Sequence, residues 1–124
     1  MYRSHQLAAS TDGADTERLT LQVENEGRLQ TWVGQGSGPI DAMVNAIGLP
    51  FDVLSYEEHS RGQGSGATAM SYIEITTRSR RTLFGTGIHA NIVTASLLAI
   101  LSAVNRAIAQ RALAARDESA RTGT

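Results

Sequence analysis

Hydrophobic and polar residues alternate along much of the first part of the chain, and this pattern predicts β-strands. Leu19, Leu21 and Val23 are separated by polar residues, which is the period of two that is typical of a half-buried strand. The following Asn25-Glu26-Gly27 predicts a hairpin turn, because Gly27 can adopt a positive φ. We therefore expect three strands in this part of the chain, at residues 2–9, 19–23 and 29–33.

A short helix is expected after the third strand. The segment Gly34-Gln35-Gly36-Ser37-Gly38 precedes Pro39, and proline suits the first helical turn because its missing N–H costs nothing there. Gly48-Leu49-Pro50 is a combination that ends helices. The pattern therefore predicts a helix over residues 39–47.

The rest of the chain repeats this order of elements. We expect strands at residues 51–60, 67–77 and 81–84, joined by a glycine-rich loop at 61–66 and a tight turn at 78–80. A long helix at 91–116 and a polar tail at 117–124 follow. The segments Thr31-Trp32-Val33-Gly34-Gln35-Gly36 and Thr82-Leu83-Phe84-Gly85-Thr86-Gly87 match in residue type, and each leads into a helix. The repeat predicts an α+β fold of duplicated βββα units, at about 2–48 and 51–116, with helices packed on antiparallel sheets.

The long second helix is apolar around most of its circumference. Its hydrophobic positions are Ile92, Val93, Ala95, Leu97, Leu98, Ile100, Leu101, Val104 and Ile108. A helix of this kind needs cover on more than one side, and a small domain with one other short helix offers little. A second copy of the chain is therefore expected as a partner, and cover by a neighbouring domain is the alternative.

Composition and charge exclude several classes of function. The chain has 124 residues, 41% of them hydrophobic, with a net charge of −1, so we expect one globular domain without an electrostatic field that recruits nucleic acid. Every basic residue is arginine and there is no cysteine, which excludes lysine and thiolate chemistry. The N-terminal residues lack the apolar core of a signal peptide, and the run at residues 92–104 is too short and polar to span a bilayer. We expect a cytoplasmic protein.

The two glycine segments are candidates for anion binding. A strand that runs into Gly-x-Gly and a helix start gathers unpaired N–H groups and the positive end of a helix dipole. The spacing Gly34, Gly36, Gly38 with proline next does not fit a dinucleotide-binding fingerprint. Tight turns required by the topology are the alternative for each segment alone. Because the segments are equivalent in the repeat, we favour one shared anion-binding site between the two helix starts.

The chain shows no catalytic apparatus. His5, His59 and His89 lack the spacing of paired metal ligands, although Glu57 and His59 share a strand face. Glu57 and Glu58 are adjacent in a strand and so point to opposite faces. The basic group Arg78, Arg80 and Arg81 is most simply a solvated hairpin tip. We therefore expect no catalytic activity, no metal, no cofactor and no nucleic-acid partner.

Several motifs together resemble a known domain family. They are Trp32-Val33-Gly34-Gln35-Gly36-Ser37-Gly38-Pro39-Ile40-Asp41-Ala42, Tyr56-Glu57-Glu58-His59, Phe84-Gly85-Thr86-Gly87-Ile88, Thr94-Ala95-Ser96 and Ser102-Ala103-Val104-Asn105-Arg106. In this order they resemble the C-terminal regulatory domain of 2-isopropylmalate synthase, and related domains occur in citramalate synthases. The resemblance covers about residues 2–112.

The resemblance implies a fold, a partner and a function. It implies two βββα units related by a pseudo-twofold axis within a regulatory domain at residues 1–116, which forms a homodimer. It implies binding of L-leucine, or of isoleucine as in citramalate synthases, for feedback inhibition of a TIM-barrel catalytic domain. That domain condenses acetyl-CoA with 2-oxoisovalerate and is not part of this chain. A purely structural dimerisation module and, less favoured, an independent small enzyme are the alternatives.

The resemblance also implies an effector site. By position the effector-binding residues are Gly36, Ser37, Gly38, Pro39, Ile40, Asp41, Val53, Tyr56, Ser60, Ala67, Ile88, His89 and Ala90. A leucine needs an apolar pocket, backbone N–H groups for its carboxylate and an acceptor for its ammonium group, for which Asp41 is the nearest acid. Ser37 stands where the family commonly has asparagine, and Ser60 and His89 stand where it commonly has small apolar residues. These differences bear on which amino acid is bound.

Overall fold

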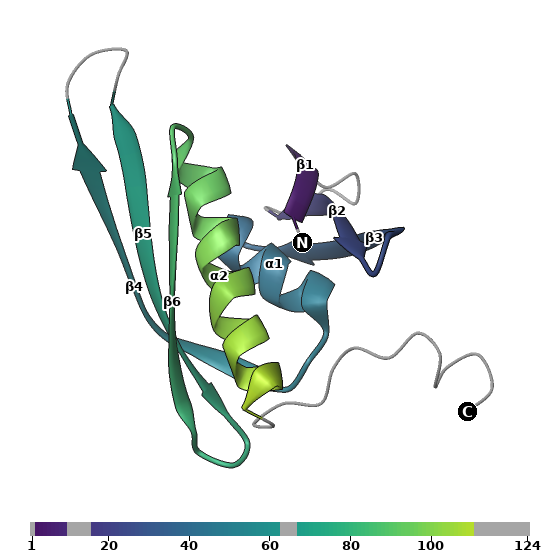
Figure 1. The fold of residues 1–124 in the computed structure, drawn as a ribbon. Coiled ribbons are helices and arrows are strands. Elements are labelled where there is room, and N and C mark those ends of the chain that lie inside the picture. Colours follow the sequence, from purple (N-terminus) through teal and green to yellow (C-terminus); the bar gives the residue numbers. More distant parts are fainter. Residues whose placement is uncertain (1, 10–15, 63–66, 111–124) are drawn as a thin grey trace.

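The chain forms two antiparallel three-stranded sheets, each covered by one helix (Figure 1). The computed structural model describes residues 2–9, 16–62 and 67–110. The elements are β1 (Tyr2–Ala9), β2 (Glu17–Asn25), β3 (Arg28–Gly36), α1 (Pro39–Ile47), β4 (Phe51–Arg61), β5 (Thr68–Thr77), β6 (Thr82–His89) and α2 (Ile92–Ala109). The α+β class and the order βββα, occurring twice, are confirmed.

The sheets have the simple orders β1-β2-β3 and β4-β5-β6, so each is a meander of hairpins. The turn between β2 and β3 uses Glu26 and Gly27, with φ of 53° and 79°. Arg80, with φ of 64°, completes the exposed turn between β5 and β6. Both hairpin turns lie where the sequence predicts them.

The core lies between each sheet and its helix and is continuous between the two halves. In the first half, Leu19 and Leu21 of β2 belong to the same buried cluster as Met43 of α1. In the second half, Leu97 and Ile100 of α2 are fully buried and join that cluster. The two helices also contact one another and lie between the two sheets (Figure 1). The two halves therefore share one hydrophobic core.

The glycine segments are parts of strands, which corrects the expectation of turns at the helix starts. Gly34 and Gly36 lie within β3, and Gly85 and Gly87 lie within β6. All four are buried beneath a helix, and a Cβ on any of them would come within 3.0 Å of helix backbone atoms. Their shared role is to let each helix lie close against its sheet. The third strands are accordingly longer than the sequence predicts.

Helix α2 is a core helix that the chain itself largely covers. One side packs on β5 and β6, and α1 contacts it as well. By length and composition it could cross a membrane, with a mean hydropathy of 1.8, but half of its residues are buried inside this fold. Leu98, Leu101 and Ile108 stay half-buried. The apolar circumference therefore does not by itself require a second chain.

In the described part of the chain helix α2 ends at Ala109, and residues 111–116 of the expected helix lie outside the described residues. The backbone N–H of Gln110 donates to the Arg106 carbonyl and closes the last turn. The expected polar tail at residues 117–124 and most of the expected loop at residues 61–66 lie outside the described residues.

Candidate ligand-binding site

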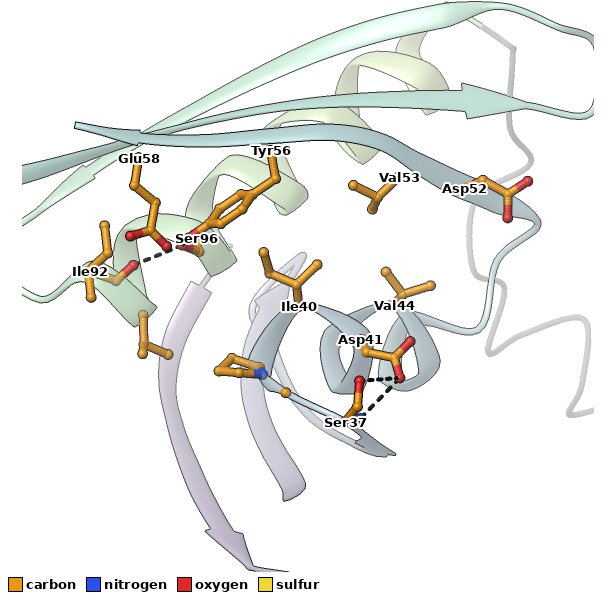
Figure 2. Close-up of a pocket in the computed structure, with 13 residues that line it drawn as sticks. Ser37, Ile40, Asp41, Val44, Asp52, Val53, Tyr56, Glu58, Ile92 and Ser96 are labelled. Atoms are coloured by element: carbon orange, nitrogen blue, oxygen red, sulfur yellow. Dashed lines mark hydrogen bonds between the residues drawn. The ribbon is translucent and has the colours of Figure 1, made fainter. Parts of the chain in front are cut away.

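A cavity of about 570 Å³ lies where the two halves of the chain meet. Figure 2 shows it between α1 on one side and β4 on the other, with the first turn of α2 at one end. Its volume is in the usual range for small-molecule sites. The lining residues are Ser37, Gly38, Pro39, Ile40, Asp41, Val44, Asp52, Val53, Tyr56, Glu58, Ile92, Val93 and Ser96.

The start of α1 offers unsatisfied backbone donors to this cavity. Gly38 is the N-cap residue and provides no side-chain cap, and Pro39 follows at the first helical position. The first intrahelical bond runs from the Ala42 N–H to the Gly38 carbonyl, so the N–H groups of Ile40 and Asp41 precede the helical ladder. With the helix dipole they favour a negatively charged group here.

Asp41 is held in place by the segment before the helix. Its Oδ2 accepts a hydrogen bond from the Ser37 N–H at 3.1 Å, and the Ser37 hydroxyl lies 3.5 Å away. This contact places a carboxylate at the mouth of the cavity (Figure 2). It also orders the residues that lead into α1.

The start of α2 differs because its own side chains cap it. Asn91 Oδ1 accepts from the Thr94 N–H at 3.0 Å, the usual N-cap bond. His89 Nδ1 in turn accepts from the Asn91 N–H at 2.9 Å. Since these donors are engaged, α1 is the helix start with more capacity for a ligand carboxylate.

A chain of hydroxyl groups closes the α2 end of the cavity. The Tyr56 hydroxyl and Ser96 Oγ lie 2.8 Å apart, and Ser71 donates to Ser96 Oγ at 3.3 Å. Ser96 itself donates to the Ile92 carbonyl at 2.9 Å. The network connects β4, β5 and the first turn of α2.

The charges around the cavity are all negative. Asp41, Asp52 and Glu58 line it, and no arginine is among the lining residues in the described part of the chain. Ile40, Val44 and Val53 supply an apolar surface between these acids. An isolated anion would be repelled, whereas a ligand that carries an ammonium group beside an apolar side chain would be attracted.

Seven of the thirteen residues expected at the effector site line this cavity. They are Ser37, Gly38, Pro39, Ile40, Asp41, Val53 and Tyr56. Gly36 lies under the first turn of α1, where it supports the helix start rather than the cavity surface. These residues come from α1 with the segment before it, and from β4.

The other expected residues lie elsewhere. Ile88 is 54% exposed on the face of β6 that points away from α2. His89 and Ala90 are exposed before the start of α2, and Ser60 is exposed near the end of β4. Ala67 precedes β5 and does not line the cavity. The second βββα unit therefore lines the cavity with the first turn of α2 and not with the residues that precede this helix.

Sequence reasoning missed six lining residues. They are Val44, Asp52, Glu58, Ile92, Val93 and Ser96. Val44 is one helical turn beyond Ile40, so the helical period could have indicated it. Ile92 and Ser96 are four positions apart on α2, and the same period relates them once one is known to face the cavity. Glu58 follows from Tyr56 by strand alternation.

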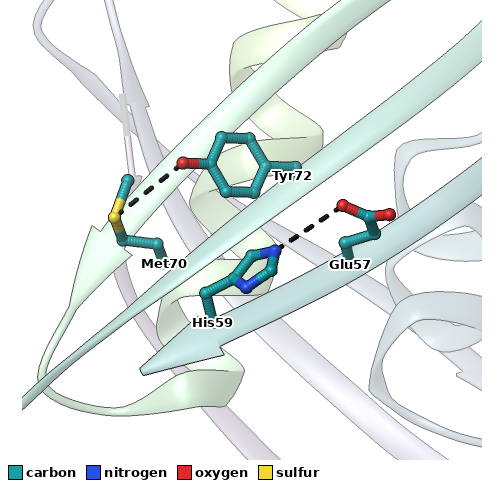
Figure 3. A network of polar contacts seen from close by, with 4 residues as sticks. All are labelled: Glu57, His59, Met70 and Tyr72. Atoms are coloured by element: carbon teal, nitrogen blue, oxygen red, sulfur yellow. Dashed lines mark hydrogen bonds and ion pairs between the residues drawn. The ribbon is translucent and has the colours of Figure 1, made fainter. Parts of the chain in front are cut away.

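The outer face of β4 and β5 carries a separate polar group (Figure 3). His59 Nε2 lies 3.6 Å from Glu57 Oε2 on the exposed surface, and the Tyr72 hydroxyl lies 3.9 Å from the Met70 sulfur. Glu57 and Glu58 thus point to opposite faces, as the alternation predicts. Among the residues that the structure describes, no group of three potential metal ligands is found.

One histidine of the first half is electrostatically linked to the second half. Burial lowers the pKa of His5 in β1, and repulsion from His89 lowers it further. The Tyr2 hydroxyl lies 2.8 Å from His5 Nδ1. Protonation of His5 is therefore disfavoured in the folded chain.

The chain is an α+β domain of two βββα units with a cavity of small-molecule size between them. The family described as LeuA allosteric (dimerisation) domain matches residues 1–108, and the chain belongs to this family. The resemblance found in the sequence motifs is thereby confirmed.

Several curated relatives are similar over most of the chain. They are 2-isopropylmalate synthases from Cupriavidus taiwanensis, 42% identical over 99% of the chain, Azoarcus sp., 44% over 89%, and Brucella suis, 46% over 74%. The matched region is 21%, 19% and 17% of these relatives, so the chain spans about one fifth of their length.

Proposed function

We propose that the chain is the effector-binding domain of a 2-isopropylmalate synthase and that the cavity between α1, β4 and α2 binds L-leucine. The observation that carries the proposal is the combination of an uncapped helix start, an apolar surface and three carboxylates around one cavity. The family match and the synthase relatives support it. Isoleucine is the alternative effector.

The three parts of the cavity correspond to the three parts of an aliphatic amino acid. The ligand carboxylate binds the N–H groups of Ile40 and Asp41 at the start of α1. The ammonium group binds one of the carboxylates, with Glu58 and Asp52 available besides Asp41. The branched side chain contacts Ile40, Val44 and Val53.

The regulatory role follows from the position of the cavity. Because residues of both βββα units line it, a bound ligand favours one arrangement of the two units over others. In the complete polypeptide this preference reduces the activity of a TIM-barrel domain that condenses acetyl-CoA with 2-oxoisovalerate in the cytoplasm. A coupling of ~1–3 kcal/mol between effector and catalytic domain is the usual magnitude. The chain acts as a homodimer and needs no metal or cofactor of its own.

Titration calorimetry of the whole chain with leucine, isoleucine and valine tests the proposal. We expect binding of at least one of them, strongest for leucine. At 100 times the dissociation constant, the bound ligand adds ~2.7 kcal/mol to the free energy of unfolding and so raises the melting temperature. Absence of heat and of thermal stabilisation with all three amino acids would refute the proposal.

A matched pair of variants locates the binding site. Ser37→Trp places a large ring at the cavity mouth but keeps the backbone N–H that donates to Asp41. Ser4→Trp introduces the same ring at an exposed strand position on β1. We expect Ser37→Trp to reduce affinity at least tenfold and Ser4→Trp to leave it unchanged. Equal affinities for the two variants would place the effector elsewhere.

A structural dimerisation module is the second candidate, because the family description includes dimerisation. It predicts a dimer in sedimentation experiments that none of the three amino acids stabilises. Binding of an amino acid would favour the effector-binding domain over the structural module.

A further inference from the structure

Ser96 is buried at the end of the cavity and has every hydrogen-bonding position of its hydroxyl occupied. Only 2% of the residue is exposed, and Ser71 beside it is fully buried. Its single proton is donated to the Ile92 carbonyl, and it accepts from Ser71. A serine hydroxyl has one donor and two acceptor positions. The Tyr56 hydroxyl, 2.8 Å away, must therefore donate into the remaining acceptor position.

This hydrogen bond holds the Tyr56 ring. The ring projects from β4 into the cavity between Glu58 and Val53 on the same strand, and its hydroxyl reaches the first turn of α2 (Figure 2). Without the bond, the χ1 torsion of Tyr56 could move to another staggered position. Such a change would move the ring within the cavity and so change the space that is available to a ligand side chain.

We propose that Ser96 is a positioning residue for effector selectivity: by accepting the Tyr56 hydrogen bond, it holds the ring against α2 and limits the side chains that the cavity admits. The inference rests on the proposed function, since it assumes that an aliphatic amino acid binds in this cavity. Ser96 acts through Tyr56 and does not itself discriminate between ligands.

The hydrogen bond also determines the polarity that Tyr56 presents. Because its proton points toward Ser96, the phenol oxygen has only lone pairs left for a ligand. Together with Glu58, it makes this end of the cavity accept hydrogen bonds rather than donate them. This arrangement favours the ligand ammonium group here and the ligand carboxylate at the start of α1.

The test compares dissociation constants for the preferred branched-chain amino acid and for phenylalanine in the whole chain. In Ser96→Ala, we expect the affinity for the preferred amino acid to fall by up to about fivefold, because ligand binding must then hold the Tyr56 ring in the position that one hydrogen bond fixes in the wild type. The affinity for phenylalanine should be unchanged or higher, because the ring is free to move. The preference for the branched-chain amino acid over phenylalanine therefore falls.

Two further variants separate positioning from a structural role. Tyr56→Phe removes the other partner of the bond and should reduce the preference to the same extent. The double variant should show no further reduction, because both changes remove one interaction. Ser102→Ala, which makes the same substitution on α2 outside the cavity, should retain the wild-type preference.

The outcomes distinguish this inference from the proposed function. If the wild-type chain binds none of the amino acids, both are overturned. If it binds leucine but Ser96→Ala weakens both ligands equally, only the selectivity role is overturned. Should Ser96→Ala not fold because Ser71 loses its partner, Tyr56→Phe decides alone. A folded Tyr56→Phe variant with wild-type preference overturns the role of Ser96.

Discussion

Gly85→Ala tests the conclusion that the strand glycines of the repeat serve helix packing and not ligand binding. Gly85 lies in the middle of β6, opposite Ile73 of β5 and beneath α2. A Cβ placed there would lie 2.5 Å from the Ala103 amide nitrogen and would overlap the Ala99 carbonyl oxygen. Real Cβ atoms essentially never approach other atoms to less than 3.0 Å. Because both neighbours are backbone atoms, no side-chain rotation relieves the overlap.

The magnitude follows from the movement that α2 must make. Moving the helix by ~1 Å forfeits roughly a quarter to a half of the attraction in each opened contact. Overpacking costs about 1–3 kcal/mol, and the backbone overlap favours the upper end of that range. Alanine also reduces the conformational entropy of the unfolded chain, and this offsets ~0.4–1 kcal/mol of the destabilisation. We expect a net loss of about 2–2.6 kcal/mol, which for a chain of 124 residues lowers the melting temperature by roughly 8–10 °C.

Urea denaturation followed by circular dichroism measures this loss. The control is Gly38→Ala, because Gly38 has an extended φ of −168° and open space where the methyl group would lie. Replacing a glycine N-cap by alanine should cost less than about 1 kcal/mol. A Gly85→Ala variant within about 0.5 kcal/mol of wild type, or equal losses in both variants, would refute the packing argument.

Two further predictions concern the start of α2 and its neighbour His5. Asn91→Ala should lower the free energy of unfolding by ~1 kcal/mol in thermal denaturation, because the Thr94 N–H loses its acceptor. Asn91→Asp keeps an acceptor and should retain most of the stability. Equal losses in the two variants would contradict the capping role of Asn91. Since the pKa of His5 is lowered in the folded chain, the unfolded chain binds more protons once the pH falls below about 6.5. The stability contributed by neutral His5 is present above that pH and is lost below it. His5→Gln should therefore reduce the dependence of the free energy of unfolding on pH below about 6.5. An unchanged pH dependence in this variant would contradict the role of His5.

Particular residues show how far local pattern predicts this fold. The alternation of Leu19, Leu21 and Val23 predicts a strand with one buried face, and all three are buried. Gly27 and the segment around Arg80 indicate turns that the structure contains. Pro39 and Gly48 indicate the ends of α1, where Gly48 adopts a φ of 68° as the C-cap. These features follow from backbone preferences of single residues and their neighbours.

The candidate site was predictable on the side that is contiguous in sequence. Ser37 to Asp41 form one segment at a helix start, and the family motif includes them. Ser96 could not be identified in this way, because its partner Tyr56 is forty positions earlier and only folding brings them together. Asp52 and Glu58 likewise could not be predicted as lining residues, because they reach the cavity only when β4 lies opposite α1.

The amino-acid sequence by itself determined the class of fold, the repeated order of strands and helices, and the family. Only the tertiary structure decided which side of each glycine-containing strand meets a helix. Gly87 and Ile88 are neighbours, but Gly87 lies beneath α2 while Ile88 points outward. The phase of alternation in β6 depends on its register with β5 and on the close approach of α2, neither of which is a property of the local sequence.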